Sequence, residues 1–93
     1  MKELKRQIAQ IIRNLITKVD KIEFNGVVND TAYSMVFYVT VDGIRSQCFD
    51  LVDDNQLDED DLMECFARIA EIIRNSEDYK HNVPFKISFN KTV

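Results

Sequence analysis

The fold follows from one stretch of the sequence, AYSMVFYVTVDG, which covers residues 32–43. Apolar side chains occupy every second position and share one face: Tyr33, Met35, Phe37, Val39 and Val41. The other face carries Ser34, Val36, Tyr38 and Thr40. This alternation is typical of a β-strand with one buried face. Asp42-Gly43 then predicts a two-residue hairpin, because glycine accepts the positive φ that a type I′ turn requires. We therefore expect an antiparallel sheet around residues 32–41, with a return strand at residues 44–51.

The length of that hairpin loop decides which side chains share a face. With a two-residue loop, Val41 lies opposite Ile44, and Ser46 and Cys48 join the face of Phe37 and Val39. A change of one residue in the loop would exchange the faces. The opposite face, which we expect to be open, collects Val36, Tyr38, Arg45, Gln47 and Phe49. Tyr38 and Phe49 are its candidate apolar anchors for a partner.

Two amphipathic helices are predicted around this sheet. Residues 2–19 and residues 59–75 both repeat apolar side chains every three or four positions, and Asp58 is a good N-cap for the second helix. Residues 21–28 and 85–90 alternate and predict two further strands. We expect one α+β domain over residues 1–93, in the order α-β-β-β-α-β. Its mostly antiparallel single-layer sheet would have about four strands, with both helices on one face.

The acidic residues are concentrated in the stretch DLVDDNQLDEDDLME, residues 50–64, which is called the acidic segment below. The chain has 16 acids and 12 bases and a net charge of −4. Eight of the acids and none of the bases lie in the acidic segment, so the rest of the chain carries a net charge of +4. Asp58, Glu59, Asp60 and Asp61 suit the N-terminus of a helix. Mutual repulsion opposes this density of like charges, which leaves two alternatives: a partner-binding surface, or a capped helix with a solvated approach.

Metal and catalytic sites find little support in the sequence. A calcium loop counted from Asp53 would need an oxygen ligand at Leu57 and a glycine at Asp58. His81 is the only histidine, and neither Cys48 nor Cys65 has a histidine at a suggestive spacing. Without a signal peptide, the two cysteines are expected to be free and buried. We expect no metal, no cofactor and no enzymatic activity.

The sequence also disfavours direct binding to nucleic acid or to a membrane. The sequence pI is near 4.9 and the bases are scattered, whereas nucleic-acid-binding domains usually carry a basic patch. No apolar run approaches the roughly 18 residues that span a bilayer, and the N-terminus lacks the pattern of a signal peptide. These features predict a cytoplasmic protein.

The order of the segments resembles a known family. The segments IAQII, YSMVFYVTVDG, LDEDDLMECFARIAEIIRNSEDYK and VPFKISF are similar, in this order, to the YezG-type immunity proteins. The chain differs from that family in having no tryptophan, and Phe85 follows Pro84. The resemblance implies a bacterial antitoxin that protects its own cell from a secreted nuclease toxin.

The sequence therefore predicts a monomeric immunity protein that binds a cognate toxin, which we expect to be a nuclease. A nuclease presents a basic cleft to phosphates, and an acidic surface can compete for that cleft. Two alternatives remain open: a phage-type inhibitor or DNA mimic, and an acidic secretion chaperone. The candidate binding residues are Asp53, Asp54, Asp58, Glu59, Asp60, Asp61, Tyr38 and Phe49.

Overall fold

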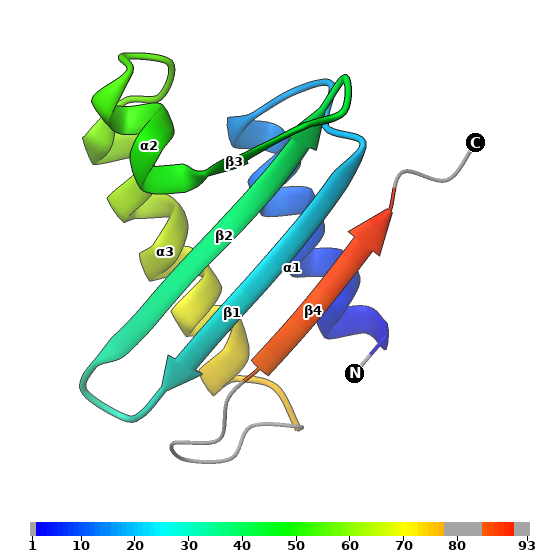
Figure 1. Ribbon diagram of the computed structural model, residues 1–93. Coiled ribbons are helices and arrows are strands. Elements are labelled where there is room, and N and C mark those ends of the chain that lie inside the picture. The colour runs from blue at the N-terminus through cyan, green and yellow to red at the C-terminus, as the bar shows by residue number, and fades with distance from the viewer. Residues whose placement is uncertain (1, 78–84, 91–93) are drawn as a thin grey trace.

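The computed structural model describes residues 2–77 and 85–90, and β2 (Tyr33–Val41) lies inside its sheet. The strand order is β3-β2-β1-β4, in which β1 is Lys21–Val28, β3 is Ile44–Gln47 and β4 is Phe85–Asn90. All three neighbouring pairs are antiparallel (Figure 1). The predicted α+β class is confirmed. The side chains of Phe85, Ile87 and Phe89, which were predicted to share a face, lie outside the described residues.

The hairpin between β2 and β3 has the predicted register. Asp42 and Gly43 have φ values of 51° and 82°, in the left-handed region that a type I′ turn needs. Val41 pairs with Ile44, and Tyr38 pairs with Gln47. Val39, Val41, Ile44 and Ser46 therefore share one face of the sheet, while Tyr38, Arg45 and Gln47 share the other.

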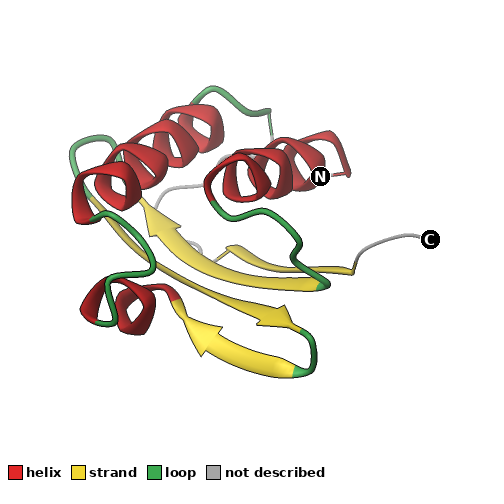
Figure 2. Cartoon of the chain, turned by 90° about the horizontal axis from the view of Figure 1, so that it is seen from above, coloured by secondary structure: helices red, strands yellow, loops and turns green. Residues whose placement is uncertain are grey.

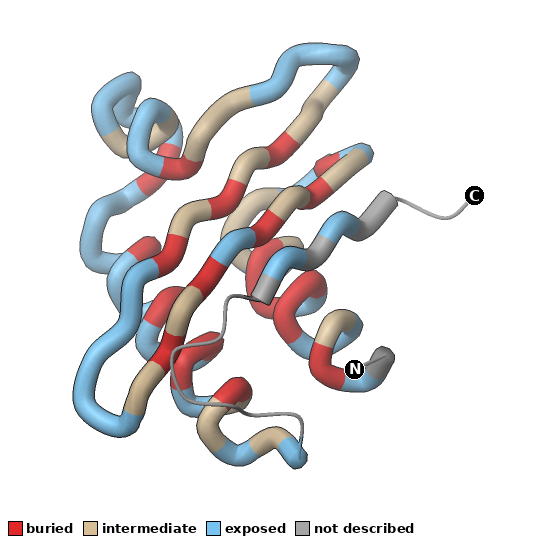
Figure 3. The backbone as a smooth tube through the Cα atoms, turned by 60° about the horizontal axis from the view of Figure 1, so that its bottom comes forward, coloured by how far each residue is buried: buried red, intermediate tan, exposed pale blue. Residues whose placement is uncertain are grey.

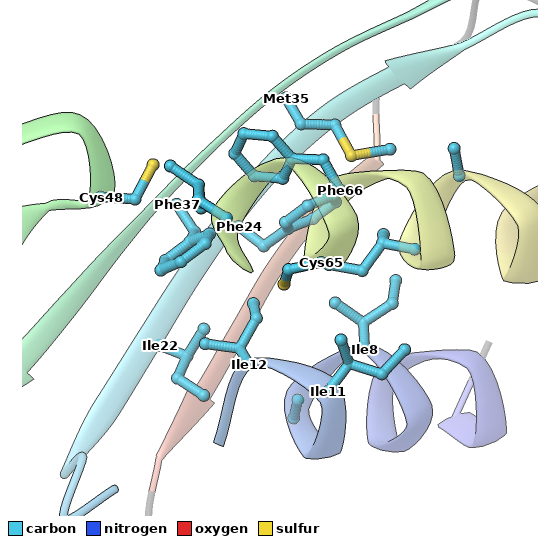
Figure 4. Close-up of a cluster of buried hydrophobic side chains, with 14 of the residues drawn as sticks. Ile8, Ile11, Ile12, Ile22, Phe24, Met35, Phe37, Cys48, Cys65 and Phe66 are labelled. Atoms are coloured by element: carbon cyan, nitrogen blue, oxygen red, sulfur yellow. The ribbon is translucent and has the colours of Figure 1, made fainter. Parts of the chain in front are cut away.

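Two helices cover the face of the sheet that carries Phe37: α1 (Lys2–Leu15) and α3 (Glu59–Arg74) (Figure 2). Along β1 and from Met35 to Thr40 of β2, every second residue is buried, and the residues between are mostly of intermediate exposure (Figure 3). Phe37 and Phe66 are both buried, as predicted, and their rings meet edge to face with centroids 6.0 Å apart. Figure 4 shows this cluster between the sheet and the two helices. The largest fully buried side chains are Phe24, Phe37, Ile8, Ile12, Ile22, Leu62, Ile69, Ile73, Val28, Val39 and Cys48.

The first helix ends earlier than the predicted residue 19. It stops at Leu15, and Lys18 adopts a φ of 62°. This left-handed residue turns the chain toward β1, so that Val19, which is only 4% exposed, enters the core from the loop. The second long helix matches the prediction closely, since it begins after Asp58 and ends at Arg74.

The predicted return strand at residues 44–51 is wrong in its second half. After Gln47 the chain forms a third, short helix, α2 (Cys48–Asp53). The reason is visible in the spacing of its apolar residues: Cys48 is fully buried, and Leu51 and Val52 are half-buried, at intervals of three and four. A strand would have placed Leu51 and Val52 on opposite faces. The element order is therefore α-β-β-β-α-α-β.

Candidate partner-binding surface

The acidic segment spans α2, the following loop and the start of α3. All eight of its carboxylate side chains are exposed: Asp50, Asp53, Asp54, Asp58, Glu59, Asp60, Asp61 and Glu64. Glu3 and Glu23, which lie outside the segment, each form an ion pair with a neighbouring base. The eight charges thus face solvent, and Arg68, which lines one hollow with Asp61 and Glu64, is the base that lies beside two of them.

Backbone hydrogen bonds hold the loop between the two helices in one conformation. The N–H of Asn55 donates to the carbonyl of Val52 at 3.0 Å, and Asn55 has a φ of 60°. The N–H of Gln56 donates to the carbonyl of Leu51 at 2.9 Å. Leu57 then turns inward and is only 8% exposed. The acidic loop is therefore anchored at both ends, by a helix C-terminus and by a buried leucine.

The same geometry bears on the calcium hypothesis. Leu57, at a position where a calcium loop needs an oxygen ligand, packs into the core. In residues 2–77 and 85–90, no group of three His, Cys, Asp or Glu side chains is arranged to hold a metal ion.

Helix capping explains part of the acidic segment. The predicted N-cap is confirmed: the Asp61 N–H donates to the Asp58 carboxylate at 3.1 Å. Glu59, Asp60 and Asp61 occupy the first turn of α3, where the helix dipole favours negative charge. Asp50 occupies the first turn of α2, a position that could not be assigned before that helix was known.

The same electrostatics disfavour two other acids of the segment. Asp53 is the last residue of α2 and Asp54 is its C-cap, and the last turn carries no base. A negative charge at a helix C-terminus faces the negative end of the dipole, which is an unfavourable position. Asp53 and Asp54 are therefore placed against the local electrostatics of the fold.

Tyr38 lies away from the acidic segment, on the face of the sheet that the helices leave uncovered. Arg45 stacks on its ring, with Cζ 3.8 Å from the ring centroid, and the Gln47 amide donates to its hydroxyl at 3.1 Å. Arg45 also donates to both carboxylate oxygens of Glu23, at 3.0 and 3.2 Å. These hydrogen bonds hold the pKa of the Glu23 carboxyl below its ordinary value. Tyr38 is thus a half-buried member of a polar network, and not part of one surface with the acidic segment.

Phe49 is not on the open sheet face, where the sequence placed it. It belongs to α2, beside Asp50, and its ring meets that of Phe66 edge to face with centroids 6.0 Å apart. Because Phe66 belongs to the helix that covers the sheet, this contact places Phe49 on the helix side. The side chain is 41% exposed, so it borders the acidic segment as a partly accessible apolar group.

Sequence reasoning missed an apolar groove of about 450 Å³ next to α2. Val41 and Ile44 lie on its sheet side, and Leu51 of α2 and Ile16 after α1 are also in its lining. The hairpin register already placed Val41 and Ile44 on one face. The helical spacing of Cys48, Leu51 and Val52 was the signal that could have predicted the wall formed by α2.

Both cysteines are free and buried, as predicted. Burial raises the pKa of the Cys48 thiol and raises that of the Cys65 thiol to about 11, so both are protonated near neutral pH. His81 lies outside the described residues.

Comparison with known proteins does not assign the chain to a family. None of the described helices combines the length and the apolar character needed to cross a membrane. No protein-family model matches the chain, and no curated protein sequence matches it.

Proposed function

We propose that this protein is a cytoplasmic immunity protein that binds, as a monomer, a basic site on a toxin of nuclease type. The acidic segment is the binding surface, and binding rather than catalysis is the activity. This proposal agrees with the resemblance of the sequence to YezG-type immunity proteins. Phe49 stays in the proposed surface as a bordering apolar group, whereas Tyr38 is left out of it because it lies on the other face of the sheet.

The observation that carries the proposal is the position of Asp53 and Asp54. Folding favours Asp58 and the acids that follow it, because they cap α3 and lie at the positive end of its dipole. Folding does not favour two exposed carboxylates at the C-terminal end of α2. Exposed charges that the fold does not need are available to attract a partner of opposite charge.

The rigidity of the segment supports the same function. The loop is fixed by the hydrogen bonds of Asn55 and Gln56 and by buried Leu57, so little ordering is required when a partner binds. A preorganised acidic surface also attracts a basic partner from a distance. Such steering accelerates association by roughly 10- to 1,000-fold at low salt and weakens as salt is added.

The test neutralises four acids of the segment and leaves the cap intact. The variant changes Asp53, Asp54, Asp60 and Asp61 to Asn, and Asp58 is kept because losing a cap costs about 1 kcal/mol by itself. The control variant carries the same change in net charge at four exposed acids outside the segment: Glu3, Asp30, Glu71 and Glu77. The partner to be tested is any nuclease toxin that is encoded next to the gene of this protein.

We expect the segment variant to lose protection of the cell and to associate with the toxin at least about tenfold more slowly at low salt. The control variant should keep both properties. If the folded segment variant protects as well as the original chain, the proposal is wrong. Equal losses in the two variants would show that only net charge matters. A DNA mimic would instead bind a nucleic-acid enzyme without a neighbouring toxin, and a secretion chaperone would form a dimer by native mass measurement.

A further inference from the structure

The apolar groove beside the acidic segment has walls from three separate elements. Its sheet side consists of Val39, Val41, Ile44 and Ser46, which share one face of β2 and β3. Leu51 of α2 forms another part of the wall, and Ile16 and Thr17 close it from the end of α1. The hairpin thus extends beyond the part of the sheet that α1 and α3 cover.

The groove leaves apolar surface accessible to solvent. Ile44 is 70% exposed, which makes it the most exposed large hydrophobic side chain among residues 2–77. Ile16, Val41 and Leu51 pack against the core and are only partly buried. The volume of about 450 Å³ falls within the usual range of binding pockets, roughly 300–1,000 Å³.

The charges near the groove are acidic. Asp42 is one of its lining residues, and the other lining residues include no base. The Asp42 N–H donates to the carboxylate of Asp20 at 3.1 Å, which brings a second exposed acid to the hairpin tip. Asp50 and Asp54 do not line the groove, but they lie one residue before and three residues after Leu51, which does. Two bases, Lys18 and Arg13, line a neighbouring hollow that shares Thr17 with the groove, but they do not line the groove itself.

We propose that this groove binds an apolar side chain from a basic protein segment, with Lys or Arg flanking that side chain. The apolar lining takes an aliphatic or aromatic group, and the carboxylates on both sides complement the flanking cations. This inference deepens the proposed function, because it assigns the partner's anchor to the groove and leaves steering to the acidic segment.

The division of roles has a kinetic meaning. Exposed charges govern how fast partners meet, whereas buried apolar contacts govern how long they stay together. Variants in the groove should therefore increase the dissociation rate, whereas variants in the acidic segment should lower the association rate.

The experiment uses the full chain, labelled with ¹⁵N, and three synthetic peptides as probes. The first peptide has a leucine flanked on each side by three lysines, the second replaces that leucine by alanine, and the third replaces the lysines by glutamates. We expect the leucine–lysine peptide to shift the amide signals of Val41, Ile44, Leu51 and Gln56. It should bind at least about tenfold more tightly than the alanine peptide, and the glutamate peptide should not bind.

Two groove variants and one control test whether the leucine of the peptide binds in the groove. Ile44→Thr keeps a β-branched residue in the strand but removes apolar surface, and Ser46→Leu fills the groove. Each should weaken binding of the leucine peptide at least about fivefold. Tyr33→Thr removes a large side chain that is 39% exposed and belongs neither to the groove nor to the acidic segment, and it should leave binding unchanged.

The outcomes separate this inference from the proposed function. The inference is overturned if the leucine and alanine peptides bind equally, if the shifts map to another surface, or if the chain dimerises through Ile44. The segment variant should weaken both lysine peptides while keeping their ratio. If the groove variants bind normally and only the segment variant fails to protect, the proposed function stands and the groove is not the anchor site.

Discussion

Replacing Phe66 by alanine should remove a large part of the stability of this domain. Phe66 is only 3% exposed, and its ring lies between two others, those of Phe37 and Phe49, with both centroid distances at 6.0 Å. It therefore joins the sheet, α3 and the short helix α2. Among residues 2–77 and 85–90, these are the two contacts between aromatic rings, and Phe66 takes part in both.

The expected magnitude follows from the burial and from the two ring pairs. A buried phenylalanine truncated to alanine costs roughly 3–5 kcal/mol, whereas a domain of this length has a total stability of about 5–14 kcal/mol. Edge-to-face pairs contribute roughly 0.5–1.5 kcal/mol each beyond their buried area. Phe66→Leu, which keeps most of the apolar volume but loses both pairs, should therefore cost about 1–3 kcal/mol.

Urea unfolding followed by far-ultraviolet circular dichroism measures both variants. With a slope near 2 kcal/mol/M, Phe66→Ala should lower the midpoint by about 2 M. Met63→Ala, a change at a 41% exposed position on the same helix, is the control and should cost well under half as much. The packing described here is wrong if Phe66→Ala costs less than about 1 kcal/mol or no more than the control.

Two further predictions concern a close approach and a thiol. Gly26→Ala should lower the free energy of unfolding, measured with urea, by roughly 1–3 kcal/mol, because an added Cβ would lie 2.7 Å from Cζ of buried Phe24. Gly43→Asn is the control and should lower it much less, because the new side chain meets open space and asparagine tolerates the left-handed turn. Burial raises the pKa of the Cys65 thiol from 9.0 to about 11, so the unfolded chain loses this proton first as the pH rises. The free energy of unfolding should therefore contain a contribution from the neutral thiol that is complete below about pH 9 and is lost as the pH rises toward 11. Urea unfolding at several pH values measures this loss, and Cys65→Ala should not show it.

The parts of the fold that sequence reasoning predicted correctly depend on local chemistry. The two-residue turn needs positive φ at both of its residues, and Asp42-Gly43 can adopt it. A turn of this length pairs Val41 with Ile44 and so determines the register. Asp58 could be identified as an N-cap because its partner, the Asp61 N–H, lies three residues away. Such features depend on neighbours in the chain and need no knowledge of the tertiary structure.

The features that were missed depend on a choice between two secondary structures or on residues that are far apart in the sequence. CFDLVD fits both a strand that continues from Gln47 and a short helix, and the burial of Cys48 and Leu51 against other elements decides between them. The position of Phe49 was wrong for the same reason. The groove could not be predicted, because it combines residues from the end of α1, from the hairpin and from α2.

The early end of β3 also bears on self-association. β3 is a terminal strand of the sheet, and an edge strand offers unpaired backbone groups to which another chain can add. The strand stops after four residues because the chain turns into α2 at Cys48. An eight-residue strand through Leu51 would have presented a longer template for intermolecular β-pairing. The short helix therefore limits the length of that exposed edge, and substitutions that favour strand over helix at residues 48–51 should promote fibrils.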